Sequence, residues 1–307
     1  MSRAPGQAHH RQRGHHRVPA ARGRVEHGEV AEAGQPSQEL GARGREIRAL
    51  RTNPAEVGKV QPHPANVSGL VNKPGLFTTL RVRDGAIRFW PAHLERLRTG
   101  AAELELRLPT DAQLGDAIAA AVGDLADARV RVTLHPDGAP SVEAAAYAAP
   151  AAPWRLRPVA AAPRRDQVRL KTTARGVYDA ARRAAADVDD ALLVAPDGTY
   201  LECTIANLFL VDPQGRLRTP PAAAPLLAGI ARRHVLAAAR ALGIDAEEGP
   251  LRPREAAQAR ECFVTNALFV AHPVAAIEGV ARYPGGALAG RLREVAIQRA
   301  TENRIIP

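Results

Sequence analysis

An abrupt change in composition near residue 74 of this 307-residue chain constrains its fold more than any other feature. Residues 1–72 are rich in Arg, Gly, His, Gln, Glu and Pro and show almost no aromatic residues or apolar periodicity. A segment of that composition cannot bury enough apolar surface to offset the entropy of ordering it. We therefore expect residues 1–72 to form a disordered basic extension, and a folded region to begin near Leu76.

Residues 73–150 carry the pattern of a small α+β domain. An apolar run from Leu76 to Val82, the turn pair Asp84-Gly85 and a second run from Ala86 to Trp90 predict a β-hairpin. Helical periodicity then predicts helices over 91–104 and 111–122, followed by strands over 129–134 and 141–148. The Ala- and Pro-rich segment 149–153 is typical of a linker.

The second half is longer and richer in strands, and we expect it to be a larger domain over residues 151–303. No period of 20–50 residues repeats along the chain. The predicted fold class is therefore α+β with two domains. Helical patterns cover 176–186, 229–242 and 287–300, and strand patterns cover 154–160, 166–171, 191–195, 200–203, 207–211, 261–265 and 268–271.

Several functional classes are disfavoured by composition. No apolar run reaches the roughly 18 residues of a membrane span, and no secretory signal precedes the folded region, so we expect a soluble, cytoplasmic protein. The two cysteines, Cys203 and Cys262, lie in strand patterns without nearby histidines. We expect both to be core residues, with neither a disulfide nor a metal site.

The net charge of +10 suggests a nucleic-acid partner, but its distribution argues against one. Residues 1–74 carry +6, and the remaining 233 residues carry only +4. The basic extension also lacks aromatic residues that would stack on bases. We expect no nucleic-acid or membrane partner, and a small molecule as the ligand.

Lysine usage points to one residue before any motif is considered. The chain has only Lys59, Lys73 and Lys171, while its other 39 basic residues are arginine. Only a primary amine can form a Schiff base, and a guanidinium cannot. Lys171 is the only lysine well inside the folded region, although a surface lysine retained by chance is an equally good interpretation on composition alone.

Separated motifs support the chemical interpretation. They are His93-Leu94-Glu95-Arg96-Leu97, Arg169-Leu170-Lys171-Thr172-Thr173-Ala174-Arg175, Leu201-Glu202-Cys203-Thr204-Ile205-Ala206-Asn207-Leu208-Phe209, Thr219-Pro220-Pro221 with Leu227-Ala228-Gly229-Ile230-Ala231-Arg232, and Phe263-Val264-Thr265-Asn266-Ala267-Leu268. In this order and spacing they resemble the fold-type IV pyridoxal-phosphate enzymes, also called class IV aminotransferases. The resemblance covers about residues 75–280 and implies pyridoxal 5′-phosphate as the cofactor.

The resemblance also implies roles for individual residues. Lys171 would hold the cofactor, and Glu202, in a Glu-x-x-x-x-Asn context with Asn207, would face the pyridine nitrogen. Free amides at a helix start bind anions well, so a helix opened by Gly229 suits a phosphate. The implied phosphate-binding residues are Arg96, Gly229, Ile230, Ala231, Thr265 and Asn266. The alternatives are a solvated helix arginine for Arg96 and an exposed carboxylate for Glu202.

Within the family the chain resembles the 4-amino-4-deoxychorismate lyase branch, which releases 4-aminobenzoate and pyruvate in folate biosynthesis. Phe77-Thr78-Thr79 stands where aminotransferases of the group have Phe-Glu-Thr, which places Thr78 next to the substrate as a catalytic candidate. Arg131 is expected to pair with a substrate carboxylate, although an exposed strand arginine is as good an interpretation. The alternative function is a class IV aminotransferase acting on branched-chain or D-amino acids.

One departure from the family pattern lies upstream. Relatives begin with a strand pair followed by Asp-Arg-Gly and Gly-Asp-Gly, whereas residues 67–75 here read Val-Ser-Gly-Leu-Val-Asn-Lys-Pro-Gly. The family is homodimeric with the site near the interface, so the resemblance implies a homodimer. Two further alternatives are a degenerate relative that binds without catalysing and a basic RNA-binding protein.

Overall fold

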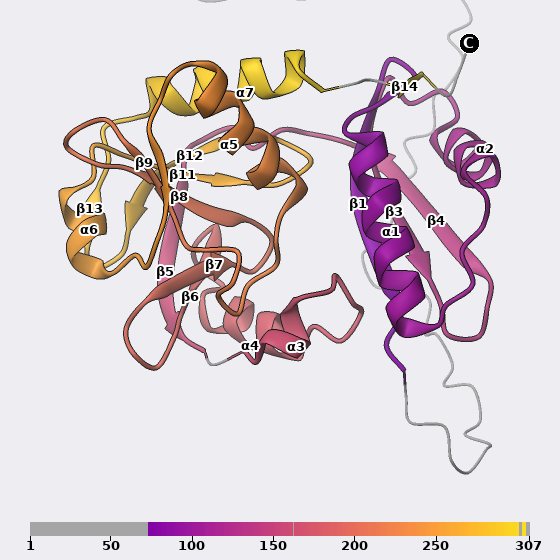
Figure 1. The fold of residues 1–307 in the computed structure, drawn as a ribbon, viewed down its shortest axis with the longest axis horizontal. Helices are drawn as coiled ribbons and strands as arrows, with labels where there is room; N and C mark the ends of the chain where they lie inside the picture. The colour runs from indigo at the N-terminus through magenta and orange to yellow at the C-terminus, as the bar shows by residue number, and fades with distance from the viewer. Residues whose placement is uncertain (1–72, 162, 301–302, 305–307) are drawn as a thin grey trace, which may run out of the picture. The chain divides into compact units, whose positions relative to one another are not determined.

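The computed structural model describes residues 73–161, 163–300 and 303–304, all within the unit Asn66–Pro307. Residues 1–72, the predicted extension, lie outside the described residues, and so does any strand pair before residue 73. In the described part of the chain, no helix is both long and apolar enough to cross a membrane. Figure 1 shows two sheets with helices packed on each.

The first sheet is antiparallel and runs in the order β14-β2-β1-β3-β4. Its hairpin forms as expected because Asp84 and Gly85 both adopt positive φ (48° and 75°), as a tight two-residue turn requires. Its strands are β1 (Leu76–Arg83), β2 (Ala86–Ile87), β3 (Asp127–Leu134), β4 (Pro140–Ala146) and β14 (Asn303–Arg304). Strand β14 therefore returns from the chain's far end to the first sheet, pairing with β2.

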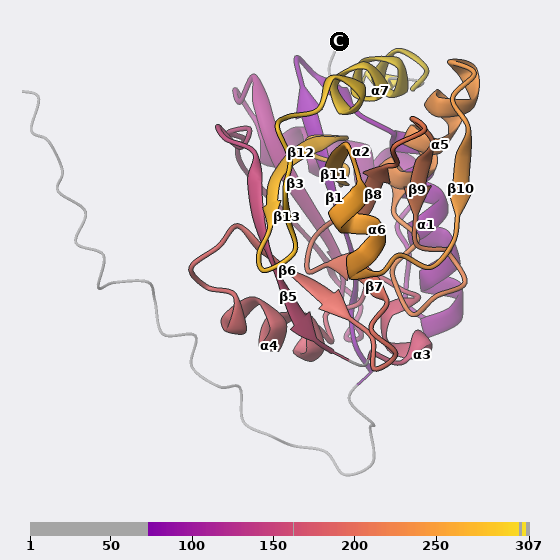
Figure 2. The ribbon, with the colours of Figure 1, turned by 90° about the vertical axis from the view of Figure 1, so that its left-hand side faces the viewer.

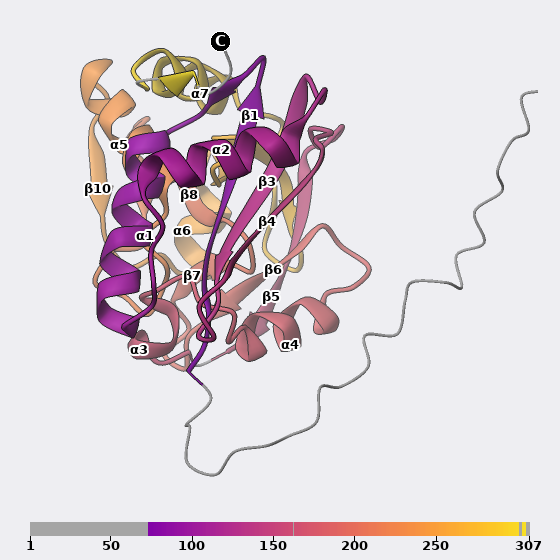
Figure 3. The same cartoon turned by 90° about the vertical axis from the view of Figure 1, so that its right-hand side faces the viewer.

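Two helices cover one face of this sheet, α1 (Trp90–Leu104) and α2 (Asp111–Val122), as Figure 3 shows. Helix α2 begins where Thr110 and Gln113 form a reciprocal capping box. Leu94 and Leu97 of α1 and Ile118 of α2 pack against Leu80 and other buried residues of the strands. The apolar face of α1 is thus buried on this sheet.

The second sheet runs in the order β10-β9-β8-β11-β12-β5-β6-β7, with β13 beside β12 and β7 also meeting β8. Figure 2 views this part of the chain from the side. The strands are β5 (Trp154–Ala160), β6 (Asp190–Val194), β7 (Tyr200–Cys203), β8 (Asn207–Val211), β9 (Leu217–Thr219), β10 (Ala246–Glu248), β11 (Glu261–Thr265), β12 (His272–Ile277) and β13 (Ala281–Arg282). The helices are α3 (Arg165–Val168), α4 (Gly176–Ala184), α5 (Ile230–Ala241), α6 (Pro253–Gln258) and α7 (Ala287–Gln298).

Strand β8 is buried on both of its faces. Phe209 and Val211 face a core shared with α5 and α7, whereas Leu208 and Leu210 face a second core. Successive side chains of a strand point to opposite faces, so a strand covered on both faces is apolar at every position. Cys203 and Cys262 are both buried in the second of these cores, as expected.

Two predicted strands are wrong. Residues 166–171 contain the short helix α3, where Gln167 caps the Arg164 amide, and a single turn is too short to show helical periodicity. Residues 268–271 form a turn, because the Asn266 side chain accepts hydrogen bonds from the amides of Leu268 and Phe269. The strand that follows, β12, was not predicted.

Candidate active site

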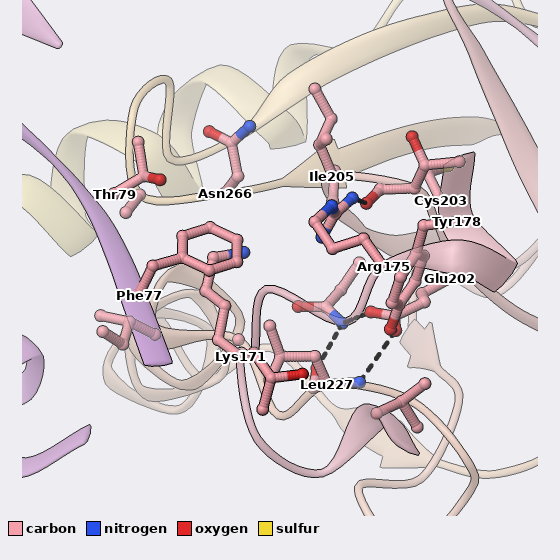
Figure 4. A pocket seen from close by; sticks show the side chains of 18 of the residues that line it. Phe77, Thr79, Lys171, Arg175, Tyr178, Glu202, Cys203, Ile205, Leu227 and Asn266 are labelled. Atoms are coloured by element: carbon pink, nitrogen blue, oxygen red, sulfur yellow. Dashed lines mark hydrogen bonds between the residues drawn. The ribbon is translucent and has the colours of Figure 1, made fainter. Parts of the chain in front are cut away.

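Lys171 follows α3 and is bound to the first sheet by its backbone. Its carbonyl accepts from the Phe77 amide at 2.8 Å, and the Thr173 amide donates to the Gly75 carbonyl at 2.8 Å. Its ammonium lies 4.8 Å from the centroid of the Phe77 ring. Strand β1 therefore sets the position of the lysine through both backbone and side chain (Figure 4).

The Lys171 side chain enters a cavity of about 320 Å³. Burial lowers the pKa of Lys171 from 10.5 to about 7, and the charges of Arg96, Arg175 and Arg131 act in the same direction. Glu202 opposes this shift without cancelling it. A substantial fraction of the amine is thus neutral, and able to act as a nucleophile or base, near pH 7.

Glu202 is the cavity's only lining carboxylate among the described residues. It is 4% exposed and accepts three hydrogen bonds, from the Tyr178 hydroxyl at 2.7 Å, the Leu227 amide at 2.9 Å and the Asn207 amide group at 3.0 Å. Burial raises the pKa of Glu202 to about 7, and the donors and nearby cations resist that rise. Figure 4 shows Glu202 and Tyr178 on one side of the cavity, with Phe77 and Lys171 on the other.

Asn207 links Glu202 to the start of α5. Its Nδ2 donates to both Glu202 and the Leu227 carbonyl, at 3.0 and 2.8 Å. A Cβ at Gly229 would lie 2.0 Å from the Asn207 Oδ1, so only glycine fits beside this asparagine. Gly229 is also the N-cap of α5, as predicted.

The start of α5 offers backbone donors to an anion. The first amides of a helix have no intrahelical acceptor, and here they belong to Ile230, Ala231 and Arg232. Gly229 and Ile230 line the cavity, whereas Ala231 is buried and does not. Arg96, on α1, also lines the cavity and donates to the Ala228 carbonyl at 2.6 Å, which places a guanidinium at the same helix end.

Thr265 and Asn266 complete this end of the cavity. Thr265 ends β11 opposite Asn207 in register, and its buried hydroxyl has no hydrogen-bond partner among the described residues. Asn266 opens the turn that follows, which its own side chain braces. The cavity thus brings together Arg96, Lys171, Glu202, Asn207, Gly229, Ile230, Thr265 and Asn266 of the predicted set.

Thr78 does not line the cavity, which corrects the prediction that it lies next to the substrate. It is fully buried on the opposite face of β1, where its hydroxyl meets His93 Nδ1 at 2.7 Å. Burial holds the pKa of His93 well below its ordinary value, so this pair is uncharged. Because strand side chains alternate, Phe77 and Thr79 line the cavity instead.

Arg131 does line the cavity, and other cations accompany it. Its guanidinium lies 3.8 Å from the centroid of the Phe77 ring, and its Nε donates to Thr133 at 3.3 Å. Arg175 lies 5.9 Å from the same ring. Among the described residues, five basic side chains and one carboxylate line the cavity, the basic ones being Arg96, Arg129, Arg131, Lys171 and Arg175.

The cavity is also lined by Phe77, Arg175 and Tyr178, which were not predicted as site residues. Arg175 ends the sequence motif that contains Lys171, four residues after it, but arginines are so frequent in this chain that the motif gave it no role of its own. Tyr178 is one of only four tyrosines in the chain, and that scarcity was the available signal.

The chain matches a family of known enzymes. A family model described as amino-transferase class IV matches residues 75–277. A Methanocaldococcus jannaschii protein assigned as a branched-chain-amino-acid aminotransferase is 29% identical over 234 residues, covering 69% of this chain and 81% of that protein.

Solved structures agree with the match. A Legionella pneumophila protein assigned as a 4-amino-4-deoxychorismate lyase superposes with a TM-score of 0.67 at 21% identity, covering 76% of this chain and 96% of that chain. The PLP-bound form of a hypothetical aminotransferase from Mycobacterium tuberculosis gives a TM-score of 0.64 at 25% identity. The match covers 78% of this chain and 95% of that chain. The likeness to the first protein, at this identity, shows a shared fold.

Proposed function

Because the chain belongs to the class IV aminotransferase family, we propose that the cavity around Lys171 is its active site. Enzymes of this family use pyridoxal 5′-phosphate, and the chain is accordingly a pyridoxal-phosphate-dependent enzyme. The proposal concerns the residues that hold this cofactor and the reaction that follows.

The donor set fits the cofactor at each of its ends. An amine with a lowered pKa, Lys171, suits the aldehyde. A buried carboxylate, Glu202, suits a protonated ring nitrogen. The phosphate would be held by Arg96, the amides that open α5, and the Thr265 hydroxyl, which has no partner among the described residues.

The bound cofactor supplies an electron sink for the electrons of a C–H bond next to the substrate amine. Lys171 accepts that proton, because its amine is partly neutral near pH 7. The carboxylate of Glu202, which three donors hold in place, would face the ring nitrogen and favour its protonated form. Phe77 and Ile205 add apolar surface to the lining of the same cavity.

We propose elimination of pyruvate from 4-amino-4-deoxychorismate as the reaction. Lys171 removes the proton from the amine-bearing carbon, the neighbouring C–O bond breaks, and the departing enolpyruvate takes up a proton to give pyruvate and 4-aminobenzoate. The arginines that line the cavity are the observation that supports this reaction. The substrate has two carboxylates, and Arg131, Arg129 and Arg175 lie in the cavity beyond the residues assigned to the phosphate.

A class IV aminotransferase is the second candidate, favoured by the similarity to the Methanocaldococcus jannaschii protein. A branched-chain amino acid has one carboxylate and an apolar side chain. Binding it would desolvate Arg131 and Arg175 without giving each an anion, which is costly. The lining therefore favours the two-carboxylate substrate over branched-chain or D-amino acids.

The deciding experiment supplies the purified enzyme with 4-amino-4-deoxychorismate and follows pyruvate with a coupled dehydrogenase. Parallel reactions contain L-leucine or D-alanine with 2-oxoglutarate and follow glutamate. We expect pyruvate without glutamate. Glutamate formation without pyruvate release would replace the lyase by an aminotransferase. The homodimer and the cytoplasmic location predicted from the sequence stay predictions.

A further inference from the structure

Tyr178 is a buried residue to which the proposed chemistry assigns no role. It lies on α4, is 7% exposed and lines the cavity. Its hydroxyl donates to Glu202 Oε1 at 2.7 Å, and this is the only side-chain hydroxyl among the donors to Glu202 in the described structure. We propose that Tyr178 is a positioning residue that holds the Glu202 carboxylate anionic and in one orientation toward the cofactor ring.

The geometry divides the donors to Glu202 into two groups. Leu227 and Asn207 belong to the segment that leads into α5 and to β8, and they are linked to each other by a 2.8 Å hydrogen bond. Tyr178 comes instead from the helix that begins five residues after Lys171. It therefore joins the lysine-bearing segment to the carboxylate, independently of the phosphate end.

Arg175 strengthens this donor. Its guanidinium lies 4.7 Å from the centroid of the Tyr178 ring, and its Nη2 is held by the Thr204 carbonyl at 2.8 Å. A cation over a phenol ring draws electron density from it. The hydroxyl consequently donates more strongly to the carboxylate than an isolated tyrosine would.

The hydrogen bond from Tyr178 matters because Glu202 is close to the balance between its acid and its anion. Burial raises the pKa of Glu202 to about 7, so the anion and the acid are close in energy near neutrality. Tyr178 is the largest of the effects that favour the anion. Without it, a proton shared between Glu202 and the ring nitrogen of a bound cofactor would move toward Glu202, and the ring would be a weaker electron sink.

The inference rests on the proposed function, and a ring-¹⁵N-labelled cofactor tests it. The holoenzyme is reconstituted with this cofactor, and the ¹⁵N chemical shift reports the ratio of protonated to unprotonated ring nitrogen at fixed neutral pH. In Tyr178→Phe we expect that ratio to fall about tenfold or more, since a hydrogen bond to a charged group is worth about one pKa unit or more. The kcat should fall with it, with KM little changed.

Tyr283→Phe is the matched control. Tyr283 is also buried, its hydroxyl donates once to the Ala256 carbonyl at 2.9 Å, and it does not line the cavity. The Tyr283→Phe variant should have the same ¹⁵N shift as the unsubstituted enzyme. Replacing Tyr178 by 3-fluorotyrosine keeps the shape and makes the hydroxyl a stronger donor, so the ratio should rise.

The outcomes separate the two proposals. An unsubstituted protein that takes up no labelled cofactor refutes the proposed function. A protein that binds it, but whose ¹⁵N shift is the same in Tyr178→Phe, or moves in the same direction with fluorotyrosine, overturns the role of Tyr178 alone.

Discussion

Phe77 and Lys171 are joined twice, by a 2.8 Å hydrogen bond from the Phe77 amide to the Lys171 carbonyl and by contact of the ammonium with the ring, 4.8 Å from its centroid. The two residues are 94 positions apart in the sequence. The first sheet thus places the amine of the second half of the chain.

Lys171→Arg should abolish covalent cofactor attachment and lower activity about a thousandfold or more, because a guanidinium keeps the charge but is no nucleophile. Borohydride reduction followed by peptide mapping should find the pyridoxyl group on Lys171 of the unsubstituted protein. The control is Lys73→Arg, since Lys73 is an exposed residue paired with Glu105. Labelling at Lys73 or Lys59 would contradict the assignment.

Cofactor capture by the apoenzyme should depend on pH through Lys171. The pKa is lowered from 10.5 to about 7, so the reactive neutral amine accumulates as pH rises through 7 and is complete above it. Stopped-flow absorbance after mixing with pyridoxal phosphate should show a rate that increases across neutrality and then levels off. A rate still rising steeply toward pH 10 would mean an ordinary lysine.

Gly229→Ala should destabilise the protein by about 1–3 kcal/mol, the usual cost of overpacking. The added Cβ would lie 2.0 Å from Asn207 Oδ1 and would displace the asparagine from Glu202. Affinity for the cofactor should fall as well. Denaturant unfolding and cofactor titration measure the two effects.

Gly290→Ala provides the comparison for Gly229. It lies within α7, where an added Cβ meets nothing within 4 Å. Stability should be unchanged or greater by up to about 1 kcal/mol, as for glycine in a helix interior. If both variants lose equal stability, the close fit of Gly229 against Asn207 is not the cause.

Substitutions of Thr78 and Thr79 should have different effects, although the two residues are adjacent. Thr78→Val removes the partner of the buried His93 Nδ1 and should lower the free energy of unfolding by about 1–3 kcal/mol, with KM retained. Thr79→Val should leave stability nearly unchanged and alter KM, because Thr79 lines the cavity. The reverse pattern would restore Thr78 as the residue next to the substrate.

Arg131→Gln should raise KM for the two-carboxylate substrate about tenfold or more, as expected for loss of a hydrogen bond to a charged group. The effect should weaken in high salt, which already screens such pairs. Arg83→Gln is the control, since Arg83 is exposed at the end of β1 and outside the cavity. An unchanged KM in the Arg131 variant would assign this arginine a structural role.

The sequence predicted the helices and strands best where an apolar pattern was long or was bounded by a turn or capping residue. The bounds of α2 and of β5, β7, β8 and β11 agree with the predicted ranges. The short elements β9, β10, β13 and α3 were not recognised, because two to four residues show no period. Tertiary contacts decide such elements, as the parallel pairing of β10 with β9 shows.

The sequence by itself determined which groups are present: a single lysine well inside the folded region, a glutamate followed five residues later by an asparagine, and a glycine at a helix start. These follow from residue type and spacing, which local chemistry constrains. Only the tertiary structure decided which side chains enter the cavity. A strand presents alternate residues to opposite faces, so the register of β1 against β3 directs Phe77 and Thr79 inward and turns Thr78 toward His93. Because both faces of β1 are largely covered, the sequence pattern does not show which face lines the cavity.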